Sequence, residues 1–132
     1  MRQVPALELE LDGRPGSVHA ARSATLRFLH EVASHDRAPL SAATRQDAVL
    51  VVSELVCNAC RHAPGPCWLS VVVTPEATVD IAVEDTSPHL PRPTGRPGPA
   101  GYGLVVVTAL GRGFHVVPTG TGKIVATTLH DR

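Results

Sequence analysis

The sequence predicts an α+β domain, a two-layer sandwich in which helices cover one face of a mixed, mainly antiparallel sheet. The chain has 132 residues, a length that suits a single domain spanning 1–132. Two long segments carry apolar residues at helical spacing, and short β-rich runs precede and follow them. Helices and antiparallel strands that are segregated in this way bury their apolar faces best as two packed layers.

A strand and two long helices are expected first. Residues 6–11 (ALELEL) alternate apolar and acidic side chains, the pattern of an edge strand with one solvated face. Ser17 follows two glycine-containing turns and stands where it would cap a helix over 18–34. A second helix is expected over 43–62, because Pro64 and its neighbours end the helical pattern there.

The second half of the chain is predicted to form two hairpins that are separated by a loop and a short helix. Runs at 68–74 and 78–84 are three residues apart, which is typical of an antiparallel hairpin. The segment 86–101 contains five prolines and three glycines without apolar periodicity, which predicts a functional or disordered loop. A helix at 104–110 and a hairpin of strands at 114–117 and 124–129 complete the predicted order.

Composition argues against several classes of function. The 12 basic residues balance 12 acidic ones and aromatic residues make up 3%, so the positive charge and stacking surfaces of nucleic-acid-binding proteins are missing. There is no apolar run of about 18 residues, and the first residues lack the order of a secretory signal. We therefore expect a cytoplasmic protein that binds neither nucleic acid directly nor a membrane.

The three cysteines allow two interpretations. Their odd number argues against a disulfide framework. Together with His62, the thiols of Cys57, Cys60 and Cys67 could form a zinc site, since Cys-x-x-Cys followed by His and Cys is a plausible ligand set. We favour small, partly buried thiols, because structural zinc ligands usually lie on short turns rather than along an amphipathic helix.

The segment 52–63 (VSELVCNACRHA) carries the most informative pattern. Glu54, Asn58 and His62 are four residues apart, so they form a polar stripe along one edge of the predicted helix. The apolar face beside this stripe comprises Ala48, Val52, Leu55, Val56, Ala59 and Ala63. A carboxylate and a carboxamide at the border of the core can order water and a hard cation such as Mg²⁺, the chemistry that a nucleoside triphosphate needs.

A second polar group, Asp85 with Ser87, follows the second strand of the first hairpin. A buried carboxylate at the end of a strand can accept a hydrogen bond from the exocyclic amine of adenine, and a wrong base would leave that carboxylate unpaired. Alternatively, Asp85 caps its own backbone in an Asp-Thr-Ser-Pro turn. The fragment alone leaves both interpretations open.

A third feature is the pair of glycines, Gly101 and Gly103, that opens the helix expected from Leu104. Glycine lets the backbone approach a ligand closely, and a helix N-terminus offers unpaired N–H groups to phosphate. Arg92 and Arg96 in the preceding loop could reach phosphate oxygens with their forked donors, or they could be solvated loop residues.

These segments and their order resemble the GHKL superfamily of ATPases and kinases, whose ATP site is called the Bergerat fold. Within it, the chain resembles the small bacterial anti-sigma-factor serine/threonine kinases. VSELVCNACRHA (52–63) resembles the N box, IAVEDTSP (81–88) the first glycine-box region, and GYGLVVVTAL (101–110) the second. GTGKIVATTL (120–129) resembles the closing hairpin.

The resemblance implies that ATP and Mg²⁺ are bound. Glu54 would be the general base or water-orienting group, Asn58 the Mg²⁺ ligand, and Asp85 the partner of the adenine amine. The implied nucleotide-binding residues are Asn58, Arg61, His62, Asp85, Ser87, Gly101, Tyr102, Gly103 and Leu104. Ser87 stands where many relatives have glycine, and Ile124 where relatives often have a threonine of the adenine pocket.

The resemblance implies one function above others. This is a Mg²⁺-ATP-dependent serine/threonine protein kinase that binds a sigma factor and phosphorylates an anti-sigma antagonist in a partner-switching pathway; a homodimer paired through strand 6–11 fits as well. An alternative is a non-catalytic module in which ATP binding changes a protein-binding surface, favoured by Ser87 and the proline-rich segment. A scaffold that no longer binds nucleotide is a third hypothesis.

Overall fold

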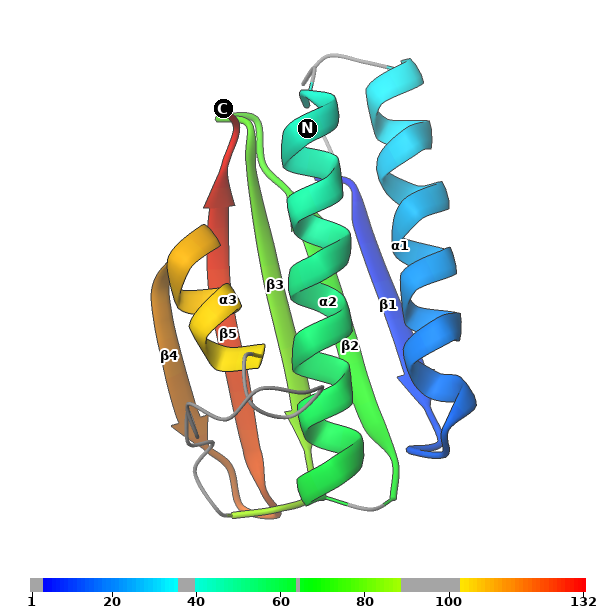
Figure 1. Ribbon diagram of the computed structural model, residues 1–132, viewed down its shortest axis with the longest axis vertical. Coiled ribbons are helices and arrows are strands. Elements are labelled where there is room, and N and C mark those ends of the chain that lie inside the picture. Colours follow the sequence, from blue (N-terminus) through cyan, green and yellow to red (C-terminus); the bar gives the residue numbers. More distant parts are fainter. Residues whose placement is uncertain (1–3, 36–39, 64, 89–102) are drawn as a thin grey trace.

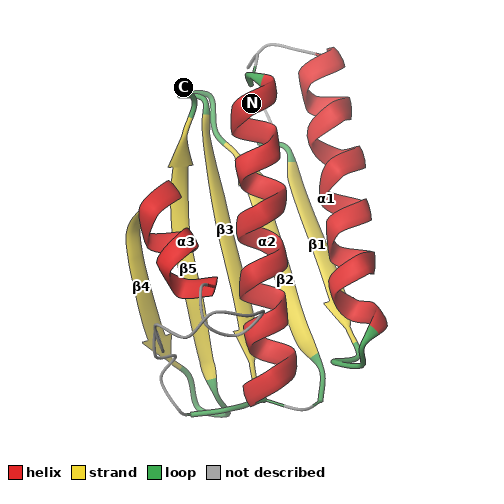
Figure 2. Ribbon diagram, in the orientation of Figure 1, coloured by secondary structure: helices red, strands yellow, loops and turns green. Residues whose placement is uncertain are grey.

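The computed structural model describes residues 4–35, 40–63, 65–88 and 103–132 of the chain. The elements are β1 (Ala6–Leu11), α1 (Gly16–His35), α2 (Ala42–His62), β2 (Cys67–Val73), β3 (Thr78–Asp85), α3 (Gly103–Leu110), β4 (Arg112–Pro118) and β5 (Lys123–His130). The strands form one sheet in the order β1-β2-β3-β5-β4, and the helices lie on one of its faces (Figures 1 and 2). This arrangement confirms the predicted fold class and the predicted order of elements.

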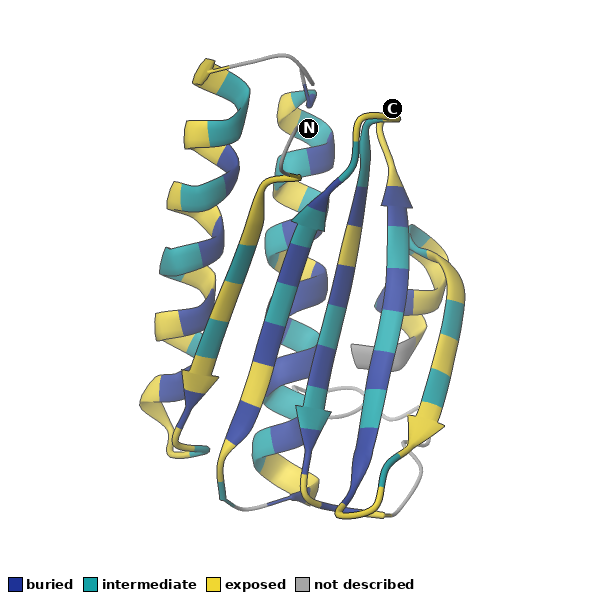
Figure 3. Ribbon diagram, turned by 180° about the vertical axis from the view of Figure 1, so that it is seen from behind, coloured by how far each residue is buried: buried dark blue, intermediate teal, exposed yellow. Residues whose placement is uncertain are grey.

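The sheet is antiparallel at each of its pairings between described strands. Strand β1 lies at one edge of the sheet, as its alternating pattern predicted. Both predicted hairpins are present, β2 with β3 and β4 with β5, and their bounds agree with the sequence pattern to within two residues. Each strand alternates between the helix-covered face and the open face that Figure 3 shows.

The prediction that Ser17 caps the first helix is wrong. Helix α1 already begins at Gly16, and the N–H of Ser17 donates to the Arg14 carbonyl at 2.9 Å. Pro15 explains the early start, because its fixed φ suits a first helical turn. The buried Ser17 hydroxyl instead donates to Asp12 Oδ1 at 3.0 Å and accepts the N–H of Gly13 at 3.1 Å, so it ties the turn after β1 to the helix.

Helix α2 crosses the middle of the sheet between α1 and α3 (Figure 1). Its N-cap is Ser41, whose hydroxyl accepts the N–H of Thr44 at 3.1 Å. The predicted apolar face is buried at all its positions, namely Ala48, Val52, Leu55, Val56, Ala59 and Ala63. None of the helices in the described ranges is long and apolar enough to cross a bilayer.

Candidate functional site

The polar segments singled out from the sequence gather at one end of the fold. The C-terminal ends of α2 and β3 and the start of β5 lie at the same end of the molecule, and α3 begins beside the C-terminal half of α2 (Figure 1). Asp85 is the last residue of β3, and Lys123, the first of β5, lies directly opposite it in the sheet. The candidate site is built from these ends.

The polar stripe of α2 has a half-buried part and an exposed part. Glu54 and Asn58 are half-buried, whereas Arg61 and His62, in the last turn, are exposed. Burial raises the pKa of the Glu54 carboxyl above its ordinary value. A carboxylate with raised proton affinity is a better general base near neutral pH, so this position suits the predicted role.

Glu54 and Asn58 lie on the side of α2 that is turned away from α1. Cys60 marks the α1 side, since Ser17 of that helix is one of the groups that influence the pKa of its thiol. Around a helix of 3.6 residues per turn, Glu54 and Asn58 are about 120° and 160° away from Cys60. They therefore lie toward the α3 side, where α3 begins at Gly103 and packs on α2 (Figure 1).

Asp85 lies on the helix-covered face and is 2% exposed. Its Oδ1 accepts the N–H of Ser87 at 2.9 Å, as in the Asp-Thr-Ser-Pro turn considered above. The turn interpretation is therefore correct for the backbone. Its carboxylate also has a second partner, which the sequence analysis did not predict.

That partner is Lys123, whose side chain is 2% exposed. Its Nζ lies 3.0 Å from Oδ1 and 2.9 Å from Oδ2 of Asp85, and it donates to the Ser87 carbonyl at 3.2 Å. The ammonium therefore donates hydrogen bonds to the Asp85 carboxylate and to one backbone carbonyl. The result is a buried, hydrogen-bonded ion pair at the position predicted to read adenine.

The strand phase that places Lys123 inside excludes Ile124 from the same cluster. Lys123, Val125, Thr127 and Leu129 alternate as the buried positions of β5. Ile124 lies opposite Glu84 and lines a shallow depression on the open face of the sheet, together with Trp68. The position of Ile124, which the resemblance matched to a threonine of the adenine pocket in relatives, is therefore on the other face of the sheet from Asp85.

Gly122 explains how closely the β4–β5 turn approaches Asp85. A Cβ atom at Gly122 would lie 1.9 Å from the Asp85 carbonyl oxygen and 2.8 Å from the Thr86 Cα, so only glycine fits there without a backbone shift. Residues 89–102, which include Arg92, Arg96, Gly101 and Tyr102, lie outside the described residues. Gly103 and Leu104 form the start of α3.

The zinc interpretation of the cysteines is wrong for the described part of the chain. There, no three His, Cys, Asp or Glu side chains gather in a way that could hold a metal ion. Cys57 and Cys60 are half-buried and Cys67 is buried, and burial raises the pKa of the Cys67 thiol to about 12. The cysteines are therefore partly buried free thiols, as we favoured from the sequence.

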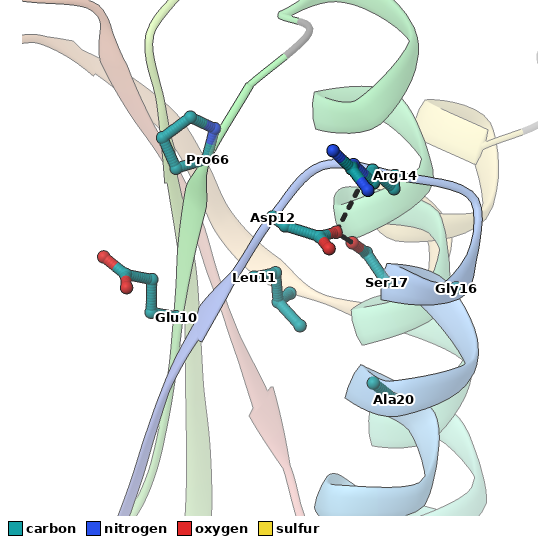
Figure 4. Close-up of a pocket in the computed structure, with 8 residues that line it drawn as sticks. All are labelled: Glu10, Leu11, Asp12, Arg14, Gly16, Ser17, Ala20 and Pro66. Carbon is teal, nitrogen blue, oxygen red and sulfur yellow. Dashed lines mark hydrogen bonds between the residues drawn. The ribbon is translucent and has the colours of Figure 1, made fainter.

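A separate depression of about 730 Å³ lies beside the start of α1 (Figure 4). Its polar groups bond to one another, because Asp12 Oδ1 accepts from both the Ser17 hydroxyl and the Arg14 N–H. These bonds lower the pKa of the Asp12 carboxyl. No residue predicted from the sequence to bind nucleotide lines this depression.

Comparison with known proteins places the fold in a family. The family model of the histidine kinase-like ATPase domain matches residues 14–129. A crystal structure of the RsbU and RsbW domains of Rv1364c from Mycobacterium tuberculosis has a similar fold, with a TM-score of 0.71 and 19% sequence identity. The match covers 96% of this chain and 32% of that one, so the chain spans about a third of its length. No curated protein matches the chain. The chain therefore belongs to the histidine kinase-like ATPase family, the GHKL superfamily that its motifs resemble.

Proposed function

We propose that this chain is a cytoplasmic ATP-binding regulator of the anti-sigma-factor type, which phosphorylates a serine or threonine of an antagonist protein. Its membership of an ATPase family and its fold, shared with a structure that contains an RsbW domain, support this proposal. The observation that carries it is the half-buried Glu54 one helical turn before the half-buried Asn58 on α2. A sigma factor and the antagonist would be its protein partners.

The residues on α2 suit the phosphate end of a nucleotide site. The Asn58 carboxamide oxygen is the kind of ligand that Mg²⁺ accepts. Mg²⁺-ATP supplies the phosphoryl group when bound. Glu54 accepts the proton of the attacking hydroxyl, and the burial that raises its pKa makes it a stronger base for that proton. Arg61 and His62 continue the same edge of the helix and are exposed to an incoming partner or phosphate.

A non-catalytic ATP-gated module is the second candidate, and the ion pair of Asp85 favours it. A carboxylate that is already paired with an ammonium is less available to hydrogen-bond the nucleotide base. A bound nucleotide therefore need not be held in the orientation that phosphoryl transfer requires. In this case ATP would change affinity for a partner protein without labelling it.

Transfer of radiolabelled phosphate from Mg²⁺-ATP to antagonist proteins encoded near this chain distinguishes the two. For Glu54→Gln we expect a loss of labelling of about 100-fold or more, with ATP affinity within about threefold of wild type, because only proton transfer is removed. Glu31→Gln, which removes an exposed carboxylate from α1, is the matched control and should label normally. Labelling that survives Glu54→Gln would refute the role of Glu54, and ATP-induced stabilisation without labelling would favour the gated module.

A further inference from the structure

We propose that Lys123 abolishes discrimination between bases at Asp85, because its ammonium occupies the place that the exocyclic amine of adenine would take. This inference rests on the proposed nucleotide site and concerns its base end. In wild-type protein, nucleotide would then be bound without readout of adenine by this carboxylate. Lys123 is the only lysine in the chain, so its side chain is the only lysine side chain that an amine-reactive reagent can modify.

The ammonium of Lys123 contacts Asp85 in the way that the amine of a bound base would. Nζ is within hydrogen-bond distance of both carboxylate oxygens, at 3.0 and 2.9 Å, and of the Ser87 carbonyl at 3.2 Å. An exocyclic amine would approach the same carboxylate as a nitrogen donor. Here the donor is covalently part of the protein and carries a full positive charge, so it is also the stronger partner for Asp85.

The fold holds Lys123 in this place. Asp85 and Lys123 face each other across β3 and β5, so their Cβ atoms point into the same layer. The backbone contact between Gly122 and the Asp85 carbonyl fixes the turn that precedes Lys123. Both side chains are at most 2% exposed, so the ammonium cannot swing out into solvent without displacing the atoms that bury it.

Displacement of Lys123 by a base is therefore unfavourable. It would separate two buried charges, each of which would need a new partner. A neutral amine donates hydrogen bonds to the carboxylate but leaves the ammonium without its acceptors. Binding energy would come from the phosphate end near Glu54 and Asn58 instead, which does not distinguish adenine from guanine.

The first test uses the single lysine as a reporter in wild-type protein. Acetylation of Lys123 by an amine-reactive ester is followed by mass spectrometry with and without saturating Mg²⁺-ATP. Arg22→Lys adds an exposed lysine on α1 as an internal standard of reactivity. We expect Lys123 to react at least 100-fold more slowly than Lys introduced by Arg22→Lys, in both states. An increase in Lys123 reactivity when ATP binds would overturn the proposal.

The second test removes the ammonium and keeps the length of the side chain. Calorimetry measures Mg²⁺-ATP and Mg²⁺-GTP binding to wild type and to Lys123→Met. We expect wild type to bind both within about threefold, and Lys123→Met to gain at least tenfold in the ratio of ATP to GTP affinity. Selective ATP binding by wild type that is lost in Lys123→Met overturns the inference and leaves the proposed function standing.

Two further outcomes bear on both the inference and the proposed function. ATP binding by Lys123→Met alone overturns the inference that wild type binds nucleotide without adenine readout, and it removes ATP binding from the proposed function of wild type. Absence of nucleotide binding by both folded proteins overturns both. If Lys123→Met does not fold, the reactivity of Lys123 in wild type decides the matter, because that measurement needs no substitution at this position.

Discussion

Neutralising one member of the Asp85–Lys123 pair should lower the free energy of unfolding far more than neutralising both. At a separation of 2.9 Å the two charges attract by about 6 kcal/mol for an effective dielectric constant of 20. Burying two ions costs several kcal/mol each, so the intact pair contributes little net stability relative to apolar residues. Removing one partner leaves the other charge buried and unpaired, at a cost of about 3–5 kcal/mol.

The double-mutant cycle of Asp85→Asn and Lys123→Met tests this reasoning by urea unfolding. With a slope of about 2 kcal/mol per molar urea, each single substitution should lower the midpoint by about 2 M. The double variant should lie within about 2 kcal/mol of wild type, which makes the coupling energy several kcal/mol. Additive effects would refute the assigned contact.

The chain offers a matched control for the same cycle. Arg132 Nε and Asp47 Oδ2 are also 2.9 Å apart, but the Arg132 side chain is 65% exposed. The corresponding cycle, Arg132→Met with Asp47→Asn, should give a coupling energy below about 1 kcal/mol. An equal coupling in both cycles would show that burial is not what makes the Asp85–Lys123 pair strong.

Two further predictions concern the turn beside the site and the end of the chain. Gly122→Ala should lower the free energy of unfolding by about 3 kcal/mol, because the added Cβ clashes with the Asp85 carbonyl. Gly120→Ala should change it by less than about 0.5 kcal/mol, because a Cβ there meets nothing within 4 Å. Equal effects of the two substitutions in urea unfolding would contradict the packing argument. The N–H of Ser41 and then the Thr44 hydroxyl lower the pKa of the Asp131 carboxyl, so its stabilising effect is complete above the unfolded-state pKa of about 4 and disappears as pH falls through the folded-state value. Asp131→Ala should therefore destabilise the fold more at pH 7 than at pH 3, and a loss that is independent of pH would refute this linkage.

The helices and strands could be predicted because their signals are local. The apolar period of α2 and its cap at Ser41 lie within the helix itself or next to it, and both hairpins connect neighbouring segments. The start of α1 was misplaced because Ser17 competes with Pro15, and the early turn at proline prevailed. The polar stripe of α2 was predictable for the same reason as its apolar face.

The partner of Asp85 could not be predicted in the same way. Lys123 follows it by 38 residues, and only the register between β3 and β5 brings the two side chains together. A weak signal was nevertheless present. Lys123 is in phase with Val125, Thr127 and Leu129, so strict alternation in β5 would have placed it inside. A lysine in a buried phase requires an acidic partner, and Asp85 was the carboxylate that one of the two open interpretations placed in a buried position.

The two ends of the candidate site therefore differ in what they can recognise. The groups on α2 are presented by one helix, are only half-buried, and remain open to a phosphate or a metal ion. The carboxylate at the end of β3 is fully buried and bound by the protein itself. A site of this kind should respond to the number of phosphates more than to the identity of the base. Loss of base readout would therefore leave the response of the proposed site to bound phosphates intact while lowering overall nucleotide affinity.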